Sequence, residues 1–333
     1  MADISVPFRV GPWPTAFAMI LACAHAGFVQ AADPAAAYPA KPIRFIVGFT
    51  PGGTSDVVAR LLAVKLAETW AQPLVVDNRP GAGGNLAIEL VARSAPDGYT
   101  LLCAWSSFSI IAGLNRELSY NPIRDFAPVT LATSAPYLLV LHPAVPAQPV
   151  KELIGLAKAQ PGKLNYASAG AGSTLHLAGE LFKSLAGVDI VHVPYKGATG
   201  ITDLIAGAVQ LSFAGLPQTL PHVKAGRLKA LAVTTSRRAA ALPELPTIAE
   251  AGVPNYEVDP WYGVIAPAAT PRAIIERLHA AFARALAAPD VREKFMLQGL
   301  ESRASTPAEF AALIKNEIAK WSKVVREAGI RAE

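Results

Sequence analysis

The sequence predicts an α/β fold built as two lobes that are joined by two crossings of the chain. Strand-like apolar runs alternate with amphipathic helical segments, and two such series follow one another. Glycine-rich loops lie between strand and helix at corresponding places in both series. With 333 residues, of which 52% are hydrophobic, the chain is long enough to form two cores. We therefore expect two mostly parallel sheets, each flanked by helices.

The first series begins with a strand over residues 43–49. A helix over residues 56–70 follows, with apolar side chains at helical spacing. The next elements are a strand over 74–77, a short helix over 86–94 and a strand over 99–104. This βαβαβ order is typical of a parallel sheet that is covered on both faces.

The second series runs from a strand over residues 138–141 to a strand over 228–234. Between them we expect strands over 164–168, 190–193 and 209–213, and helices over 150–159, 174–185 and 202–206. A proline-rich stretch over 242–254 predicts irregular chain. A strand over 261–266 and helices over 271–287, 290–297 and 307–328 complete the expected elements.

The two series imply that the chain passes from one lobe to the other near residues 126–136 and returns near 259–266. We assign residues 38–131 plus 260–333 to lobe 1 and residues 132–259 to lobe 2. Two crossings suit a hinge. Ligands of open α/β sheets bind beyond the carboxyl ends of the strands, so the cleft between the lobes is the expected site.

Residues 1–31 have the features of a signal peptide, which predicts export to the periplasm. Arg9 precedes an apolar run over residues 13–28, and small residues around Ala31 provide a cleavage site. The run is too short for a comfortable membrane span. Cys23 ends a segment similar to a lipoprotein cleavage box, so lipid attachment there is the less favoured alternative.

Composition and motifs exclude several function classes. The net charge of +5 is modest and the basic residues are scattered, which argues against nucleic acid as a partner. The histidines lack metal-ligand spacing, and no glycine loop completes a dinucleotide, P-loop or nucleophile-elbow motif. We expect no cofactor, no metal and no enzymatic activity. An enzyme remains the main alternative because catalytic triads are assembled in space, although no nucleophile–base pair is evident.

Three loops share one design, in which glycines follow a strand and precede a helix. They are Gly52-Gly53, Gly81-Ala82-Gly83-Gly84 and Gly170-Ala171-Gly172. Glycine lets a ligand approach the backbone closely, and a helix N-terminus adds unpaired N–H donors with a partial positive charge. In a single loop of this kind the glycines often serve only to form the turn. Because the pattern recurs in both lobes, we expect an anion site.

The first two loops belong to the longer motifs Phe49-Thr50-Pro51-Gly52-Gly53-Thr54-Ser55-Asp56 and Asn78-Arg79-Pro80-Gly81-Ala82-Gly83-Gly84-Asn85. Two further motifs are Pro96-Asp97-Gly98-Tyr99-Thr100-Leu101-Leu102 and His192-Val193-Pro194-Tyr195-Lys196-Gly197. In this order they resemble Bug-type receptors, the periplasmic solute-binding proteins of tripartite tricarboxylate transporters. The resemblance covers about residues 38–328. It implies a monomeric Venus-flytrap protein that holds a small carboxylate in its cleft and delivers it to the membrane subunits of a transporter. A sensor subunit that presents its ligand to a kinase is a further alternative.

The resemblance also implies which residues contact the ligand. In lobe 1 they are Phe49, Gly53, Thr54, Asp56, Ala82, Gly83, Ser106 and Ser107. In lobe 2 they are Ser168, Ala169, Gly170, Ser173, Thr174, His176, Tyr195 and Gly197. Members of the family often carry an acidic residue and an asparagine where this chain has Ala214 and Gly215. Because an ammonium group in a closed cleft needs an acceptor, we expect a ligand without a free amine.

Overall fold

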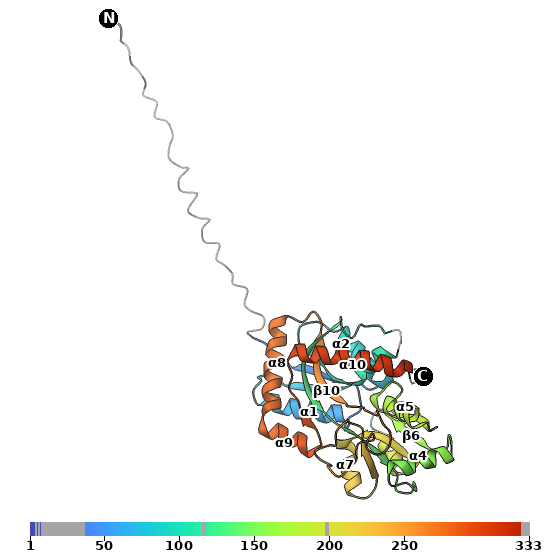
Figure 1. Cartoon of the computed structure of the whole chain (residues 1–333). Coiled ribbons are helices and arrows are strands. Elements are labelled where there is room, and N and C mark those ends of the chain that lie inside the picture. Colours follow the sequence, from blue (N-terminus) through green and yellow to red (C-terminus); the bar gives the residue numbers. More distant parts are fainter. Residues whose placement is uncertain (4, 6, 8–36, 115–117, 197–199, 328–333) are drawn as a thin grey trace.

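The computed structural model describes residues 1–3, 5, 7, 37–114, 118–196 and 200–327, and Figure 1 draws the whole chain. Almost all of the expected signal peptide, including Cys23, lies outside the described residues. Within them, no helix combines the length and the apolar character that a membrane crossing requires.

The first sheet has the strand order β11-β4-β10-β3-β1-β2. Its strands are β1 (Ile43–Val47), β2 (Leu74–Asn78), β3 (Thr100–Trp105), β4 (Phe126–Ser134), β10 (Trp261–Pro267) and β11 (Glu301–Ser302). β1 pairs in parallel with both β2 and β3. β10 runs antiparallel to its neighbours β3 and β4, and β11 runs antiparallel to β4.

The second sheet has the strand order β7-β6-β8-β5-β9. Its strands are β5 (Tyr137–Leu141), β6 (Asn165–Ser168), β7 (Val191–Pro194), β8 (Leu211–Gly215) and β9 (Lys229–Val233). β6 is parallel to β7 and β8, whereas β5 is antiparallel to β8 and β9.

The predicted α/β class is confirmed, with one correction: each sheet is mixed and not mostly parallel. The reason lies in the crossing segments. β4 and β5 follow one another directly and carry the chain from the first sheet to the second. β10 brings the chain back and enters the first sheet against the direction of β3. Neighbouring strands are parallel only where helices connect them within one sheet, because a helical crossover returns the chain to the end of the sheet at which the previous strand began.

The helices cover both sheets. They are α1 (Thr54–Ala67), α2 (Asn85–Ala92), α3 (Ser107–Gly113), α4 (Val150–Ala159), α5 (Thr174–Ala186), α6 (Gly200–Ile205), α7 (Leu216–Lys224), α8 (Arg272–Ala287), α9 (Pro289–Leu297) and α10 (Pro307–Glu327), and a 3₁₀ turn, η1 (Ala82–Gly84), precedes α2. The sequence analysis missed α3 and α7. Both begin directly after a strand, and α7 contains Pro221, so neither shows a regular helical pattern.

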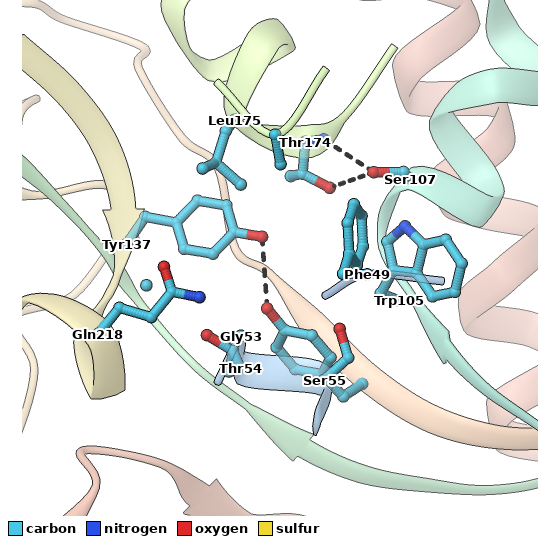
Figure 2. Close-up of a pocket in the computed structure, with 13 residues that line it drawn as sticks. Phe49, Gly53, Thr54, Ser55, Trp105, Ser107, Tyr137, Thr174, Leu175 and Gln218 are labelled. Atoms are coloured by element: carbon cyan, nitrogen blue, oxygen red, sulfur yellow. Dashed lines mark hydrogen bonds between the residues drawn. The ribbon is translucent and has the colours of Figure 1, made fainter. Parts of the chain in front are cut away.

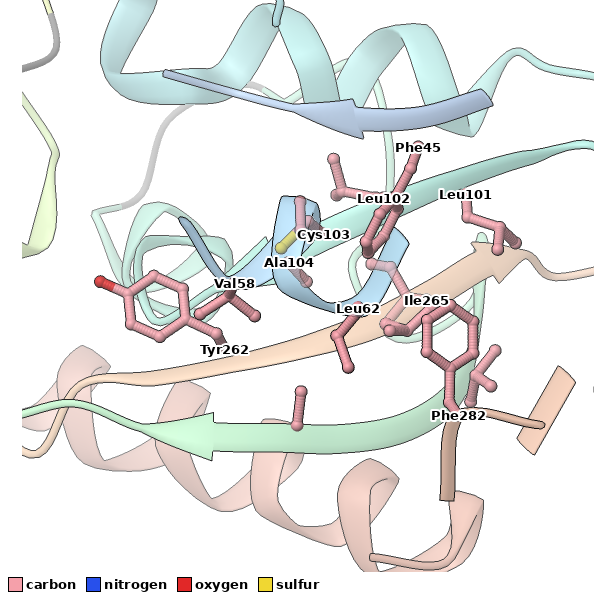
Figure 3. Packing of buried hydrophobic residues seen from close by; sticks show 14 of the residues in the cluster. Phe45, Val58, Leu62, Leu101, Leu102, Cys103, Ala104, Tyr262, Ile265 and Phe282 are labelled. Atoms are coloured by element: carbon pink, nitrogen blue, oxygen red, sulfur yellow. The ribbon is translucent and has the colours of Figure 1, made fainter. Parts of the chain in front are cut away.

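We call the first sheet with its helices the first lobe, and the second sheet with its helices the second lobe. Figure 1 shows α1, α8 and α9 beside the first sheet and α4, α5 and α7 around the second. In the first core, Phe45, Leu62 and Phe282 pack around the sheet (Figure 3). Cys103 lies in this core, where burial raises the pKa of its thiol, so the thiol packs in the core as an unreactive group.

Two helices connect the two cores, since Phe108 of α3 and Phe310 of α10 belong to the buried cluster of the first lobe. Trp321 and Val325, near the end of α10, belong to the buried cluster of the second lobe, together with Ile110 and Leu114 from the region of α3. Figure 1 accordingly shows α10 running from the side of α8 toward α5. Residues near the end of the chain, assigned to lobe 1 from the sequence, thus pack on the second lobe as well. The division into lobes 38–131 plus 260–333 and 132–259 stays a prediction.

Candidate functional site

A pocket lies between the two sheets, at the points where several strands end and helices begin (Figure 2). It encloses about 460 Å³ of empty space, the solvent at its mouth included. Its lining residues are Phe49, Gly53, Thr54, Ser55, Trp105, Ser107, Tyr137, Ala169, Thr174, Leu175, Gly215, Gln218 and Tyr262. Both lobes contribute to this wall, which is where the sequence placed the ligand.

The first glycine loop presents the N-terminus of α1 to the pocket. Gly53 is the N-cap residue and its position provides no side-chain cap, so the first N–H groups of α1 have no side-chain acceptor. Gly53 has an ordinary φ of −73°. A Cβ at this position would lie 3.3 Å from the Nε2 atom of Gln218. A larger side chain here would crowd the end of the Gln218 side chain in the cleft, whereas the backbone angle suits any residue.

Asp56 holds this loop from behind. Its carboxylate is 3% exposed and accepts hydrogen bonds from the Gly52 N–H at 3.0 Å, from Arg60 at 2.9 Å and from Asn78 at 3.0 Å. Burial alone would raise the pKa of Asp56, but these hydrogen bonds together hold that pKa below its ordinary value. Asp56 does not line the pocket; it fixes the loop that does.

The third glycine loop is braced in a similar way. The Ser168 hydroxyl accepts a hydrogen bond from the Gly170 N–H, and the Nδ1 atom of His176 accepts one from the Gly172 N–H. Ser173 caps α5 by accepting a hydrogen bond from the N–H of His176. These buried side chains position the loop, and Ala169 and Thr174 are the residues that reach the pocket wall.

The two lobes meet across the pocket. The Thr174 N–H donates to the Ser107 hydroxyl at 2.8 Å, and the hydroxyls of Ser107 and Thr174 lie 2.9 Å apart (Figure 2). A Cβ at Gly83 would lie 2.6 Å from the carbonyl oxygen of Ala171, so the second and third glycine loops touch backbone to backbone. The conformation is therefore a closed one.

A pair of tyrosines forms another part of the wall. The hydroxyls of Tyr137, at the start of β5, and Tyr262, in β10, lie 3.4 Å apart (Figure 2). Burial raises the pKa of Tyr137 to about 12, although hydrogen bonds with Tyr262 and Thr174 oppose that rise. Burial likewise raises the pKa of Tyr262. Both phenols are neutral at physiological pH. The sequence analysis missed both because each lies at a crossing between the sheets.

Trp105 and Gln218 are further pocket residues that were missed. Trp105 is the last residue of β3, and its ring lies 4.9 Å from that of Phe49. Its position at a strand end was a usable signal, because that is where ligands of α/β sheets bind. Gln218 lies in α7, which the sequence did not predict, so nothing pointed to it.

The structure sorts the predicted contacts into four groups. Phe49, Gly53, Thr54, Ser107, Ala169 and Thr174 line the pocket. Ala82, Gly83 and Gly170 lie in the glycine loops that meet beside it. Asp56, Ser106, Ser168, Ser173, His176 and Tyr195 are held in hydrogen bonds with other residues, Ser106 with the backbone of Trp261 and Tyr195 with Asp203. Gly197 lies outside the described residues.

The structure contains one nucleophile–base pair that was not evident in the sequence. The Ser168 hydroxyl lies 2.6 Å from the Nε2 atom of His192, whose ring stacks on His176 at 4.0 Å. Ser168 is 3% exposed, its hydroxyl already contacts the backbone of Gly170, and it does not line the pocket. A substrate in the pocket would not reach it. The pair therefore braces the loop.

The pocket wall carries no aspartate, glutamate, histidine, lysine or arginine among the described residues. No group of three such side chains or cysteines in the described part of the chain could hold a metal ion. Electrostatic attraction for a ligand must then come from helix N-termini, backbone N–H groups and neutral donors, an environment that suits a small anion.

Comparison with known proteins agrees with this geometry. The family model described as tripartite tricarboxylate transporter family receptor matches residues 58–330. BugT of Bordetella pertussis is 39% identical over 297 residues, which are 88% of this chain and 91% of that protein. The structure of R. palustris Rpa4515 with adipate is 40% identical, with a TM-score of 0.85 over 88% of this chain and 99% of the other. The periplasmic binding protein BugD is 33% identical, with a TM-score of 0.85 over 89% and 100% of the two chains.

Proposed function

The chain belongs to the tripartite tricarboxylate transporter receptor family, as its motifs predicted, and from this premise we propose that it binds a small carboxylate in the pocket between its lobes. Its role is then to capture the solute in the periplasm, after export by the signal peptide, and to deliver it as a monomer to the membrane subunits of a transporter. The solved relative that carries adipate supports the ligand class.

One observation carries this proposal. The uncapped N-terminus of α1 opens into a pocket that both lobes close over and that has no charged side chain in its described wall. A carboxylate matches the open N–H donors and the partial positive charge of a helix end. A cation would find no counter-charge there and would lose its hydration.

The proposed ligand has no free amine. Ala214 is fully buried in β8 and does not line the pocket, and its neighbour Gly215 offers no side chain. No carboxylate in the described wall could accept from an ammonium group, and a buried unpaired charge is costly.

We further propose that the bound solute leaves unchanged. The relatives are binding proteins, and the Ser168–His192 pair has no access to the pocket. Incubation with a bound carboxylate, followed by mass analysis of the released solute, checks this. A chemically altered product would favour the enzyme alternative.

Native mass spectrometry of gently purified protein tests the ligand class, followed by a thermal-shift screen of carboxylic acids against the emptied protein. We expect a retained small acid, and stabilisation by members of the same class. A ligand present at a hundred times its dissociation constant stabilises the folded state by about 2.7 kcal/mol, which such a screen detects. Stabilisation by amines or sugars, with none by acids, would contradict the proposal.

A further inference from the structure

The pocket offers one strong position for an anion. α1 has no side-chain cap, so its first donors are open. At α5 the Thr174 N–H already donates to Ser107, and the His176 N–H donates to Ser173. α7 has a proline in its first turn, Pro217, which has no N–H to donate. α3 also begins in the wall, at Ser107 and without a side-chain cap, but it is only seven residues long. A second carboxylate on the same ligand would find only this shorter helix end and no charged side chain in the described wall.

Much of the wall is apolar or aromatic, beside the polar side chains of Thr54, Ser55, Ser107, Thr174 and Gln218. Phe49, Trp105, Leu175 and the ring of Tyr137 surround the space beside α1 (Figure 2), and Tyr262 also lines the pocket. The two tyrosine hydroxyls lie within hydrogen-bonding distance of one another. Flat apolar groups gain most from such a surface, because rings pack edge to face or in offset stacks.

One fully buried polar atom in this wall lacks a partner among the described residues. Trp105 is 2% exposed, and its Nε1 atom has no hydrogen-bond partner among the described residues. Its indole ring is held firmly, since a Cβ at Gly48 or at Gly84 would overlap it. Figure 2 draws the indole nitrogen on the side of the ring that faces Phe49. A buried N–H without an acceptor is costly, so an acceptor supplied by a ligand would stabilise the complex.

An unpaired indole N–H does not by itself indicate a ligand. Trp261 also has a buried Nε1 atom without a partner among the described residues, and its ring packs against Phe310 in the core. Trp261 is not part of the pocket wall, whereas Trp105 is. The difference in position gives the two tryptophans different expected roles.

We infer that the ligand is a monocarboxylate with a flat apolar body that carries a neutral oxygen, and that this oxygen accepts a hydrogen bond from the indole N–H of Trp105. Oxo and hydroxy acids of aromatic or short apolar compounds belong to this class. The inference rests on the proposed function and narrows its ligand class. It makes Trp105 a specificity-determining residue.

Matched pairs of acids test this on the emptied mature protein. Benzoate is compared with meta- and para-hydroxybenzoate, pentanoate with levulinate, and terephthalate and succinate serve as dicarboxylates, all by calorimetry. Each pair is measured on the wild type, on Trp105→Phe and on Trp261→Phe. Trp105→Phe keeps an aromatic ring and removes the N–H, and Trp261→Phe removes the same group away from the pocket.

We expect a hydroxy or oxo acid to bind more tightly than its unsubstituted parent. Trp105→Phe should weaken that acid about tenfold, or about 1.4 kcal/mol, while the parent changes less than about twofold. Trp261→Phe should alter neither. In spectra of protein with isotope-labelled tryptophan, one indole N–H signal should shift when levulinate is added and stay in place with pentanoate.

Other outcomes would overturn the inference. Equal losses for both members of each pair would mean that Trp105 acts through shape alone. Tighter binding of the dicarboxylates than of every monocarboxylate would contradict the single anion position. The spectra decide the question should Trp105→Phe fail to fold. If none of these acids nor any other carboxylate bound, the proposed function itself would fail, which is a distinct result.

Discussion

Replacing Gly83 with alanine tests whether contact between the second and third glycine loops controls ligand affinity. Gly83 has φ 64° and ψ 17°, a left-handed conformation, and a Cβ there would lie 2.6 Å from the carbonyl oxygen of Ala171. The strain of an alanine in the left-handed conformation would be present whether the lobes are open or closed. The clash of its Cβ with the Ala171 carbonyl would exist only when the lobes are closed, because Gly83 and Ala171 come from opposite lobes.

The two effects have separate magnitudes. Alanine in the left-handed region costs about 1–2 kcal/mol of folding stability. Overpacking at a tight contact costs about 1–3 kcal/mol, and here that cost falls on closure. Since each 1.4 kcal/mol is tenfold in a dissociation constant, Gly83→Ala should weaken the ligand roughly five- to a hundredfold. It should lower stability without ligand by no more than the backbone effect.

Gly187→Ala is the matched control. Gly187 ends α5 with φ 62°, and a Cβ there would meet no atom within 4 Å. Both variants should lose similar stability in urea denaturation without ligand, while calorimetry with a carboxylate found in the screen should show weakened binding for Gly83→Ala alone. If both variants bound like the wild type, the loops would not need to touch when the ligand is held.

Four further predictions concern the pocket and the loop that Asp56 holds. Gly53→Val should abolish detectable binding, because a branched side chain would enter the space in front of Gln218. The thermal denaturation midpoint should stay within a few degrees of the wild type, because the φ of −73° suits valine. Normal binding by this variant would show that the first glycine loop is not part of the site. Affinity for the ligand should be constant from about pH 6 to pH 9, because burial keeps the pKa of Tyr137 at about 12 and no aspartate, glutamate, lysine, arginine or histidine lines the described wall. A change in the dissociation constant of more than about threefold in calorimetry would reveal a ligand contact that titrates in this range. At lower pH the relevant group is Asp56, whose pKa in the folded state is below its unfolded value of about 3.9. Its contribution to folding stability is therefore complete above the unfolded pKa and is lost as the pH falls through the folded pKa. Asp56→Asn should be less stable than the wild type at neutral pH, and acid titration should show the two stabilities converging. Succinate should bind more tightly than aspartate, and calorimetry showing the reverse would refute the exclusion of amines.

Local sequence patterns predict much of the fold. The apolar run that forms β1 and the helical spacing within α1 each identify their element without reference to the rest of the chain. β4 was expected only as a crossing, although it pairs with β10 over its whole length. Its identity depends on tertiary partners: the Thr130 and Thr133 hydroxyls bond to the backbone of Ser305 and Glu301, far along the chain.

The residues of the site likewise fall into those that local sequence predicts and those that depend on tertiary contacts. The glycine loops could be identified because their design is local: a strand, a turn and a helix in immediate succession. Tyr137 and Tyr262 are separated by 125 positions, and only the return of the chain through β10 brings their hydroxyls together. His176 and Ser168 lie beside the third glycine loop, as expected, but the hydrogen bonds that occupy them depend on His192 and on the folded loop.

The pocket wall without charged side chains bears on how ligand preference changes during evolution. Under the proposed function, the carboxylate is held by main-chain N–H groups of α1, which every residue except proline supplies. Substitutions at Phe49, Trp105 or Leu175 would then alter the fit of the ligand body while the hold on its carboxylate persists. A lineage of such receptors could pass from one acid to another by single steps, each intermediate still a working binder of anions.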